Sequence, residues 1–354
     1  GSKVDDESFT DLEGYYIFRP GDVLNGRFFA TSKQGRGTFS TVLRVKDQAD
    51  GDRECVIKVI RNNEYMKKKS LEEMQKLVLL TSKDPEGKRN CVRLFSHFEQ
   101  RGHLCMVFEP MLMNLREYIS KRGGRPLEIT DVRSMGFQLL RALSLCKRCG
   151  LIHADLKPDN LLIGMDRKTV KLSDFGSSLH RQEVVRTNNG VPVTSLIGSM
   201  GYRAPEILAG ISLDFPCDIW SAGATLCELL TGKILYKGTN DNQMLLLQME
   251  LCGNFPKKLV KRAAFREKHF GSDGVFLETK VDPLSKVELR VPRPDLNTPI
   301  KSFEKDVLRH VAKAKRKKRA EFANLLAQMF IMDPSKRPNV KECMKHSFFH
   351  SSAQ

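Results

Sequence analysis

The sequence predicts an α+β fold with two lobes: a small lobe built on an antiparallel sheet with one key helix, and a larger, mainly helical lobe. Two observations support this prediction. Short apolar runs of strand type, separated by Gly, Asp and Asn, fill the first third of the chain, whereas apolar residues recur with helical spacing after Met111. The change falls at residues 109–111, where we expect the boundary between the lobes.

Strands are expected in four segments of the first third: 28–42, 55–60, 91–99 and 103–108. One helix is expected among them. Ser70 can cap its start, and an apolar face with a 3.6-residue period is formed by Leu71, Met74, Leu77 and Val78. The small lobe is therefore expected at residues 28–110, and residues 1–27 are expected to form an extension that packs on it.

Helices are expected in the rest of the chain at residues 115–120, 132–146, 218–230, 244–249 and 321–332. The larger lobe is therefore expected to span residues 111–354.

The 354-residue chain carries a formal net charge of +17, which is typical of proteins that bind nucleic acid, membrane surfaces or acidic partners. The densest basic run, residues 313–319 (KAKRKKR), fits a nuclear-import address or a phosphate-binding patch, and equally well a solvated helix face. No apolar run is long enough to span a bilayer, so we expect a soluble protein without a membrane partner.

Nine cysteines occur without a repeating spacing. Cys146 and Cys149 lack the second ligand pair that a zinc site requires, so we expect reduced cysteines in a helix and turn, and a reducing compartment.

A glycine-rich stretch, residues 34–42 (QGRGTFSTV), is typical of a loop that binds phosphate, because glycines let backbone amides approach phosphate oxygens. Ser40 stands where a third glycine is usual, and two glycines also fit a plain hairpin turn. The residues of this stretch assigned to the nucleotide site are Gln34, Gly35, Arg36, Gly37, Thr38, Phe39, Ser40 and Val42.

Lys58 lies in an apolar strand, where an ammonium group needs a partner or a ligand. It would hold the α- and β-phosphates of a nucleotide, or else reach solvent from an edge strand. Glu73, beside the apolar face of the expected helix, is its expected partner. Two alternatives remain open, because Glu72 is adjacent and Glu73 could instead complete a capping box with Ser70.

The strongest motif is the run 153–160 (HADLKPDN). Asp155 and Asn160 have the separation of a general base and a metal-binding amide on one loop. Asp155 would orient the substrate hydroxyl, Lys157 would neutralise the transferring phosphoryl group, and Asn160 would bind Mg²⁺.

A second motif, residues 174–176 (DFG), follows a hairpin-like stretch at 161–173. Asp174 is expected to be the second Mg²⁺ ligand, next to the phosphates of ATP. Phosphoryl transfer depends on positioning and on cations placed against developing charge, and these residues supply both.

Three further features are expected to be structural. Glu206, in the run 204–206 (APE), could pair with Arg337, and Asp218, two residues before the single Trp, could brace the catalytic loop.

With these motifs in this order, residues 28–349 resemble the protein kinase superfamily. The runs 174–177 (DFGS) and 202–206 (YRAPE) and the long stretch at about 233–320 resemble the CMGC group, which carries an insert there. The resemblance narrows to the Prp-four pre-mRNA-splicing kinases through the runs 13–16 (EGYY), 60–64 (IRNNE), 108–111 (FEPM), 114–117 (NLRE) and 153–160.

This resemblance implies a Ser/Thr kinase that uses ATP and Mg²⁺ and phosphorylates spliceosomal proteins in the nucleus. It implies a monomer, a site open to ATP-competitive inhibitors and no requirement for direct nucleic-acid binding. It also implies that Phe108 is the gatekeeper and that the backbone of Glu109 and Met111 bonds adenine. The adenine ring would lie among Val42, Val56 and Leu162. Val56 replaces the usual Ala, which should alter inhibitor preference.

The activation segment departs from the relatives. Leu196 stands in place of a phosphorylated tyrosine and Met200 in place of an arginine, while Ser199 keeps the hydroxyl that contacts Asp155 and Lys157. Activation by tyrosine autophosphorylation at the usual site and a preference for proline after the target are therefore not expected. Other phosphorylation candidates are Thr187, Thr194 and Ser195.

Ala154 replaces the usual arginine of the catalytic run and cannot hold a phosphate on the activation segment. We therefore expect activity that depends little on an arginine–phosphate clamp.

Three functional hypotheses follow. The first is an active splicing kinase, or a LAMMER-type or dual-specificity CMGC kinase with other nuclear substrates. The second is a scaffold without catalysis, which the altered loop and activation segment would favour. The third is a nucleic-acid-binding module, which rests on charge alone and would require a steep salt dependence.

Overall fold

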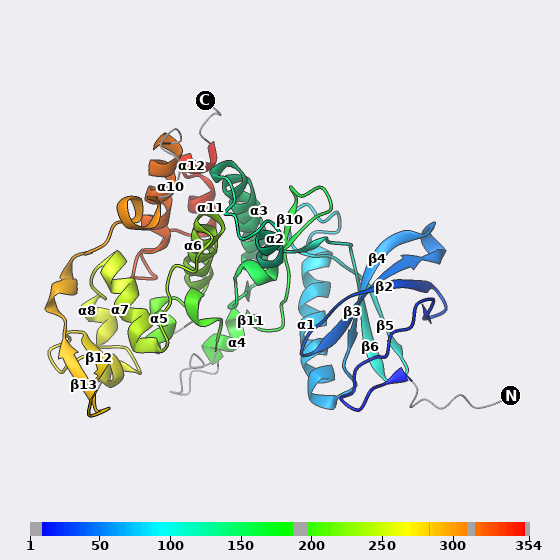
Figure 1. Ribbon diagram of the computed structural model, residues 1–354, viewed down its shortest axis with the longest axis horizontal. Coiled ribbons are helices and arrows are strands. Elements are labelled where there is room, and N and C mark those ends of the chain that lie inside the picture. The colour runs from blue at the N-terminus through cyan, green and yellow to red at the C-terminus, as the bar shows by residue number, and fades with distance from the viewer. Residues whose placement is uncertain (1–8, 187–196, 212, 283, 310–315, 351–354) are drawn as a thin grey trace. The chain divides into compact units, whose positions relative to one another are not determined.

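The computed structural model describes residues 9–186, 197–211, 213–282, 284–309 and 316–350. The chain divides into two compact units, of which the first comprises Gly1–Met113 and Leu162–Gly176 and the second Asn114–Leu161 and Ser177–Gln354. Figure 1 labels most of their helices and strands. Sheet and helix are segregated along the chain, so the fold is α+β, as predicted.

The first unit is built on a six-stranded sheet in the order β1-β2-β3-β4-β6-β5, with antiparallel neighbours. Its strands are β1 (Val23–Leu24), β2 (Phe28–Arg36), β3 (Ser40–Asp47), β4 (Arg53–Ile60), β5 (Leu94–Gln100) and β6 (His103–Phe108). Helix α1 (Glu64–Lys83) contacts β4, β5 and β6. The first unit also contains η2 (Gln48–Asp50) and β10 (Val170–Leu172), and the division between the units falls within β7 (Met113–Asn114) and β9 (Leu161–Ile163).

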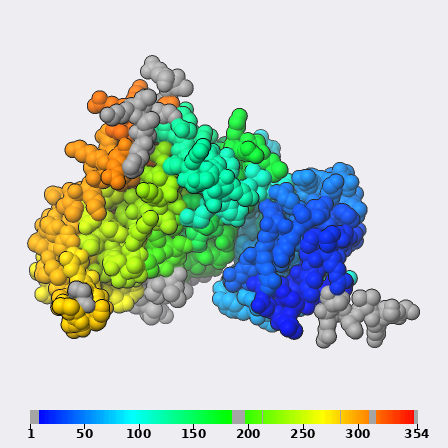
Figure 2. All heavy atoms as spheres, in the orientation of Figure 1, coloured from blue at the N-terminus to red at the C-terminus, as the bar shows by residue number. Residues whose placement is uncertain are grey.

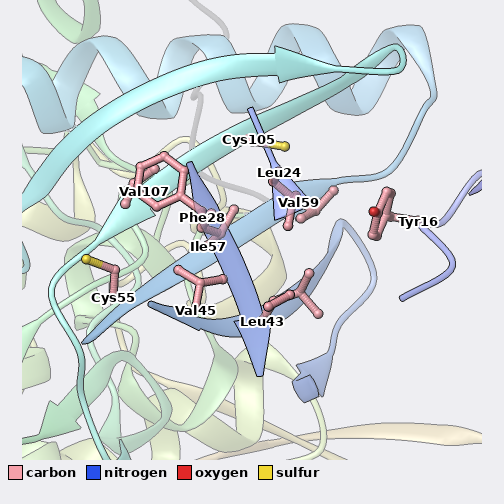
Figure 3. Close-up of a cluster of buried hydrophobic side chains, with 11 residues drawn as sticks. Tyr16, Leu24, Phe28, Leu43, Val45, Cys55, Ile57, Val59, Cys105 and Val107 are labelled. Carbon is pink, nitrogen blue, oxygen red and sulfur yellow. The ribbon is translucent and has the colours of Figure 1, made fainter. Parts of the chain in front are cut away.

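A cluster of buried apolar side chains covers one face of this sheet (Figure 3). It includes Leu43 and Val45 of β3, Ile57 and Val59 of β4, and Val107 of β6, all at most 1% exposed. Side chains alternate between the two faces of a strand, so the intervening residues of β3, β4 and β6 point to the other face. That second face carries the nucleotide-site candidates.

Helix α1 begins earlier than predicted. Asn63 caps it, its side chain accepting a hydrogen bond from the Met66 N–H group at 3.2 Å, and Ser70 is buried within the helix. The predicted cap at Ser70 is therefore wrong. Three consecutive lysines, residues 67–69, follow in the first two turns and hid the start of the helix because they give no apolar period.

The second unit is mainly helical. Its helices are α2 (Leu115–Lys121), α3 (Ile129–Arg148), α4 (Arg181–Arg186), α5 (Pro205–Leu208), α6 (Pro216–Thr231), α7 (Asp241–Cys252), α8 (Lys257–Val260), α9 (Arg266–His269), α10 (Arg316–Met329), α11 (Val340–Met344) and α12 (Ser347–His350). Short strands pair as β8 (Leu151–Ile152) with β11 (Leu179–His180) and as β12 (Leu277–Val281) with β13 (Glu288–Pro292). Short helical turns are η3 (Pro158–Asn160), η5 (Met200–Tyr202), η6 (Pro294–Asn297) and the π-helix η7 (Phe303–Val307).

Helix α6 forms the centre of the second unit because every residue from Cys217 to Leu230 is buried. It packs against α3 and α10. The ring of Trp220 stacks on Tyr236 at 6.0 Å and meets Phe330 edge-on at 4.8 Å. Gly232 ends the helix with a φ of 70°, a left-handed conformation that favours glycine.

No disulfide joins any of the nine cysteines, all of which lie among the described residues, which fits the predicted reduced state. Cys146 lies in α3 and Cys149 directly follows it. Within the part of the chain that the structure describes, no helix has the length and apolar character needed to cross a membrane.

Candidate active site

The glycine-rich stretch forms the turn between β2 and β3. The Gly37 N–H group donates to the Ser40 carbonyl at 2.9 Å, and Gly35 pairs with Val42 in the sheet register. A Cβ atom added to Gly35 or Gly37 would meet nothing within 4 Å. Contacts within the protein therefore do not demand glycine here, and the two glycines leave the backbone open to close approach by a ligand.

The adenine candidates share the second face of the sheet. Val42 lies directly opposite Lys58 in the β3–β4 register, and Val56 lies opposite Phe108 in the β4–β6 register. Directly opposed residues point to the same face, as do residues two apart, so these four side chains lie on one face. The structure thus groups them, and their roles toward ATP remain a prediction.

Lys58 pairs with Glu73, as predicted. The Nζ–Oε2 distance is 2.7 Å, and the two side chains are 23% and 8% exposed. Burial acts against the charge of Lys58, but the carboxylates of Glu73 and Asp174 outweigh it and raise the pKa of the ammonium group. Glu72 instead pairs with Lys69 at 2.9 Å, which excludes the adjacent alternative.

The segment after β6 is held by side chains. The Glu109 carboxylate accepts hydrogen bonds from Lys171 Nζ at 2.7 Å and from the Arg93 N–H group at 2.8 Å. The Met111 carbonyl accepts from Arg44 at 3.1 Å and from Gln34 at 3.4 Å. Gln34 therefore links the start of the glycine-rich stretch to this segment, where the backbone is expected to bond adenine.

Asp174 and Phe175 have defined positions in the first unit. Asp174 has a φ of 60°, in the left-handed region that is unusual for residues other than glycine. The Phe175 ring is fully buried, and its carbonyl accepts a hydrogen bond from Lys76 of α1 at 3.3 Å. Helix α1 thus carries both the partner of Lys58 and a contact that fixes the residue next to Asp174.

Asp155 forms a connected group with Lys157 and Ser199 in the second unit. Lys157 Nζ lies 2.8 Å from Asp155 Oδ2 and 2.7 Å from Ser199 Oγ. The Ser199 hydroxyl and N–H groups both donate to Asp155 Oδ1, at 2.8 and 2.9 Å. The predicted contacts of Ser199 are therefore confirmed, and one carboxylate oxygen of Asp155 is oriented by two donors from a single residue.

Asn160 donates through its amide nitrogen to the Asp155 carbonyl at 2.7 Å. This orientation assigns the amide oxygen as the atom that would bind a cation. Carboxylate and amide oxygens are ligands that Mg²⁺ prefers, so Asp174 and Asn160 have suitable chemistry. Their joint role as metal ligands remains a prediction.

Asp218 braces the catalytic run, as predicted. Its carboxylate accepts from the N–H groups of His153 at 2.8 Å and Ala154 at 2.9 Å. Burial raises the pKa of Asp218, although His153 and the two N–H groups act in the opposite direction. Ala154 itself has a φ of 66°. The bracing stabilises a backbone shape that the sequence alone would disfavour.

Arg116 was not predicted to act near the catalytic run. Its guanidinium donates to both carboxylate oxygens of Asp159 at 2.8 and 2.9 Å, to Glu228 at 2.7 Å and to the Tyr202 hydroxyl at 2.7 Å. The Tyr202 hydroxyl also donates to Glu228. Burial and Glu228 raise the pKa of Tyr202, so the phenol keeps its proton. The sequence signal was an acid, Glu228, within the mostly apolar stretch that forms α6.

The expected pair of Glu206 and Arg337 is present and fully buried, with N–O distances of 2.7 and 2.9 Å. By contrast, Thr187, Thr194, Ser195 and Leu196 lie outside the described residues, as do Lys313 and Lys315 of the basic run. The predictions made for them stay open.

Comparison with known proteins gives a consistent result. The protein kinase domain family matches residues 29–349. The serine/threonine-protein kinase prp4 of Schizosaccharomyces pombe is 37% identical over 97% of this chain and 71% of its own length. The serine/threonine-protein kinase prpf4B of Dictyostelium discoideum is 35% identical over 97% of this chain, which spans only 42% of that relative.

The dual specificity protein kinase CLK1 of Homo sapiens is less similar, at 28% identity over 96% of this chain and 69% of its own length. Family match, relatives and geometry agree on the reaction type. The chain therefore belongs to the protein kinase family, as a serine/threonine kinase domain similar to the prp4 kinases.

Proposed function

We propose that this kinase domain transfers the γ-phosphate of ATP to serine or threonine hydroxyls of pre-mRNA splicing proteins in the nucleus. The observation that best supports the chemistry is the group formed by Asp155, Lys157 and Ser199, in which the base and the cation lie 2.8 Å apart. The resemblance to splicing kinases supports the substrate class.

In the second unit, Asp155 orients the attacking hydroxyl and accepts its proton. Lys157 remains beside it and offsets negative charge on the transferring phosphoryl group. Ser199 holds both side chains in place, because its hydroxyl donates a hydrogen bond to Asp155 and accepts one from Lys157. Phosphoryl transfer needs this positioning more than covalent help from the protein.

In the first unit, Lys58 bonds the α- and β-phosphates and is kept charged by Glu73, while the glycine-rich turn covers them. Asp174, with Asn160 of the second unit, would hold Mg²⁺, which when bound neutralises charge on the phosphates. Val42, Val56 and Leu162 would enclose adenine beside the gatekeeper Phe108.

Phosphate transfer from Mg·ATP to a generic basic protein tests the catalytic roles. Asp155→Asn and Lys58→Met should each lower kcat by roughly 100-fold or more, because a general base and a phosphate ligand are removed. Asp131→Asn, at an exposed acid in the first turn of α3, is the matched control and should keep the wild-type rate. A wild-type rate for Asp155→Asn in a folded protein would contradict the assignment.

The substrate class needs a separate experiment. Phe108→Gly should open the pocket beside Val56 to an N⁶-substituted ATP thiophosphate analogue, and labelled nuclear proteins can then be identified by mass spectrometry. Splicing proteins should be enriched relative to the Phe108→Gly/Asp155→Asn control. Labelling confined to proteins of other processes would refute the splicing role while leaving the kinase assignment intact.

A further inference from the structure

The start of the described chain packs on the sheet of the first unit. We call residues 9–22 the N-terminal strap. Figure 2 shows this dark-blue start of the chain on the surface of the first unit, next to the lighter blue strands. A tight turn at its centre is closed by the Gly14 N–H group, which donates to the Asp11 carbonyl at 2.8 Å, and Tyr15 and Tyr16 directly after it are buried.

Tyr15 contacts the glycine-rich turn. Its hydroxyl donates to the carbonyl of Thr38 at 3.0 Å, and Thr38 lies at the exposed tip of the turn. The Arg36 guanidinium lies over the Tyr15 ring at 3.7 Å and pairs with Glu13 at 2.5 Å. A buried side chain of the strap thus holds a loop tip that no other described element anchors through a side-chain hydrogen bond.

The same turn of the strap contacts the chain that leads into α1. The Asn62 N–H group donates to the Gly14 carbonyl at 2.7 Å, and Arg61 Nε donates to the Glu13 carbonyl. A Cβ atom on Gly14, whose φ is +85°, would lie only 2.8 Å from the Asn62 carbonyl oxygen. This position therefore needs glycine for both its conformation and its close approach.

Arg61 connects the two contact regions. Its N–H group donates to the carbonyl of Phe39 in the glycine-rich turn at 2.8 Å, and its guanidinium lies 4.7 Å from the Tyr15 ring centre. The next residues cap and begin α1, the helix that carries Glu73, the partner of Lys58. Tyr15 therefore lies where the phosphate-binding turn and the entrance to α1 meet.

We propose that Tyr15 is a positioning residue for ATP: its hydroxyl holds the tip of the glycine-rich turn at the height at which the turn covers the phosphates. The proposal rests on the assignment of this turn and Lys58 to the ATP phosphates. A flexible glycine turn loses conformational freedom when it closes on a ligand, so a preformed tip lowers the cost of binding.

Tyr16 provides a matched control on the same strap. Its hydroxyl donates to Asp22 at 3.1 Å, and its ring belongs to the core cluster, where Figure 3 shows it at one end. Tyr15→Phe and Tyr16→Phe each remove one hydroxyl from a buried ring of the strap. Only Tyr15→Phe removes a bond to the glycine-rich turn.

The test compares kcat, the KM for ATP, and the affinities for Mg·ATP and for adenosine, which lacks phosphates. Loss of one hydrogen bond should raise the KM for ATP and the Kd for Mg·ATP roughly 2- to 10-fold in Tyr15→Phe, with adenosine affinity unchanged and the unfolding midpoint lowered no more than in Tyr16→Phe. Tyr16→Phe should leave the KM for ATP unchanged.

Three results would overturn the proposal: a wild-type KM for ATP in Tyr15→Phe, an equal rise in Tyr16→Phe, or an equal loss of adenosine and Mg·ATP affinity. Lys58→Met separates this inference from the proposed function. If Lys58→Met is inactive and Tyr15→Phe is normal, only the positioning role fails. If Lys58→Met keeps full activity, the phosphate site itself is misassigned.

Discussion

The buried ion pair of Arg337 and Glu206 should be coupled strongly enough for a double-mutant cycle to detect. Their side chains are 0% and 2% exposed. Arg337 also donates to the backbone carbonyls of Pro216 at 2.8 Å and Ile331 at 3.0 Å. One guanidinium thus joins the start of α5 to the first residue of α6 and to the segment after α10.

Arg337→Met leaves the Glu206 carboxylate buried without a cation, and such uncompensated burial costs about 3–5 kcal/mol in the free energy of unfolding. Glu206→Met leaves the guanidinium in the same position, with a similar cost. The double variant contains neither charge, so it should be no less stable than either single variant. Independent effects would instead sum to roughly 6–10 kcal/mol, a large part of the ~5–15 kcal/mol available to a domain.

Urea unfolding followed by tryptophan fluorescence suits this test, because Trp220 is the single tryptophan and the Arg337 guanidinium lies 5.1 Å from its ring centre. Arg181→Met is the matched control. Arg181 also makes two bonds to a carboxylate, that of Asp214, but the side chains are 53% and 41% exposed, so the loss should stay below about 1 kcal/mol. Additive losses in the double variant, or a loss at Arg337 as small as that at Arg181, would refute the reasoning.

Two further predictions concern the second unit. Ser199→Ala removes the hydroxyl that joins Asp155 to Lys157, so kcat should fall roughly tenfold, and Ser199→Thr should restore it; an unchanged kcat in Ser199→Ala would contradict this. Burial lowers the pKa of His269 to about 4, below its ordinary value of 6.5; the backbone of Leu208 opposes this shift and the cations of Lys268 and Arg290 add to it. Between these values the unfolded state binds a proton that the folded state does not, so the free energy of unfolding should fall by about 1.4 kcal/mol per pH unit on acidification. Urea unfolding at about pH 6 and about pH 5, both inside this interval, should show this slope in the wild type and a flatter one in His269→Gln, and equal slopes would exclude His269 as its source.

The catalytic run and its immediate partners could be predicted from the sequence because their chemistry is encoded over short distances. Asp155, Lys157 and Asn160 lie within six residues, so one short motif is enough to predict that they belong to one loop. Ser199 was predictable from its position before Tyr202, although it lies 44 residues after Asp155. Sheet and helix were predictable from periodicity, since most expected strands and helices overlap the observed ones.

Long-range polar partners were not predictable in the same way. The three partners of Arg116 lie 43, 86 and 112 residues further along the chain, and nothing local to Arg116 distinguishes it from a solvated helix residue. The start of α1 was missed for a different reason. The lysine run at residues 67–69 interrupts the apolar face of the first two turns, so the cap was predicted seven residues too late, at Ser70 instead of Asn63.

The contacts of the N-terminal strap were not predictable for the same two reasons: its partners are distant in sequence, and no local pattern marks them. Tyr15 and Tyr16 are adjacent aromatic residues, and no sequence pattern distinguishes the one that binds a loop carbonyl from the one that fills the core. That distinction comes from the turn at Gly14. The Gly14 carbonyl accepts a hydrogen bond from the Asn62 N–H group, which fixes the strap against the entrance to α1. Consequently Gly14→Ala should change the position of Tyr15 more than that of Tyr16. The added methyl would displace the turn from Asn62, whereas the ring of Tyr16 would keep its neighbours in the core cluster. The residues proposed to perform the chemistry are thus encoded locally, whereas the residue inferred to position the glycine-rich turn is defined only by contacts that the fold creates.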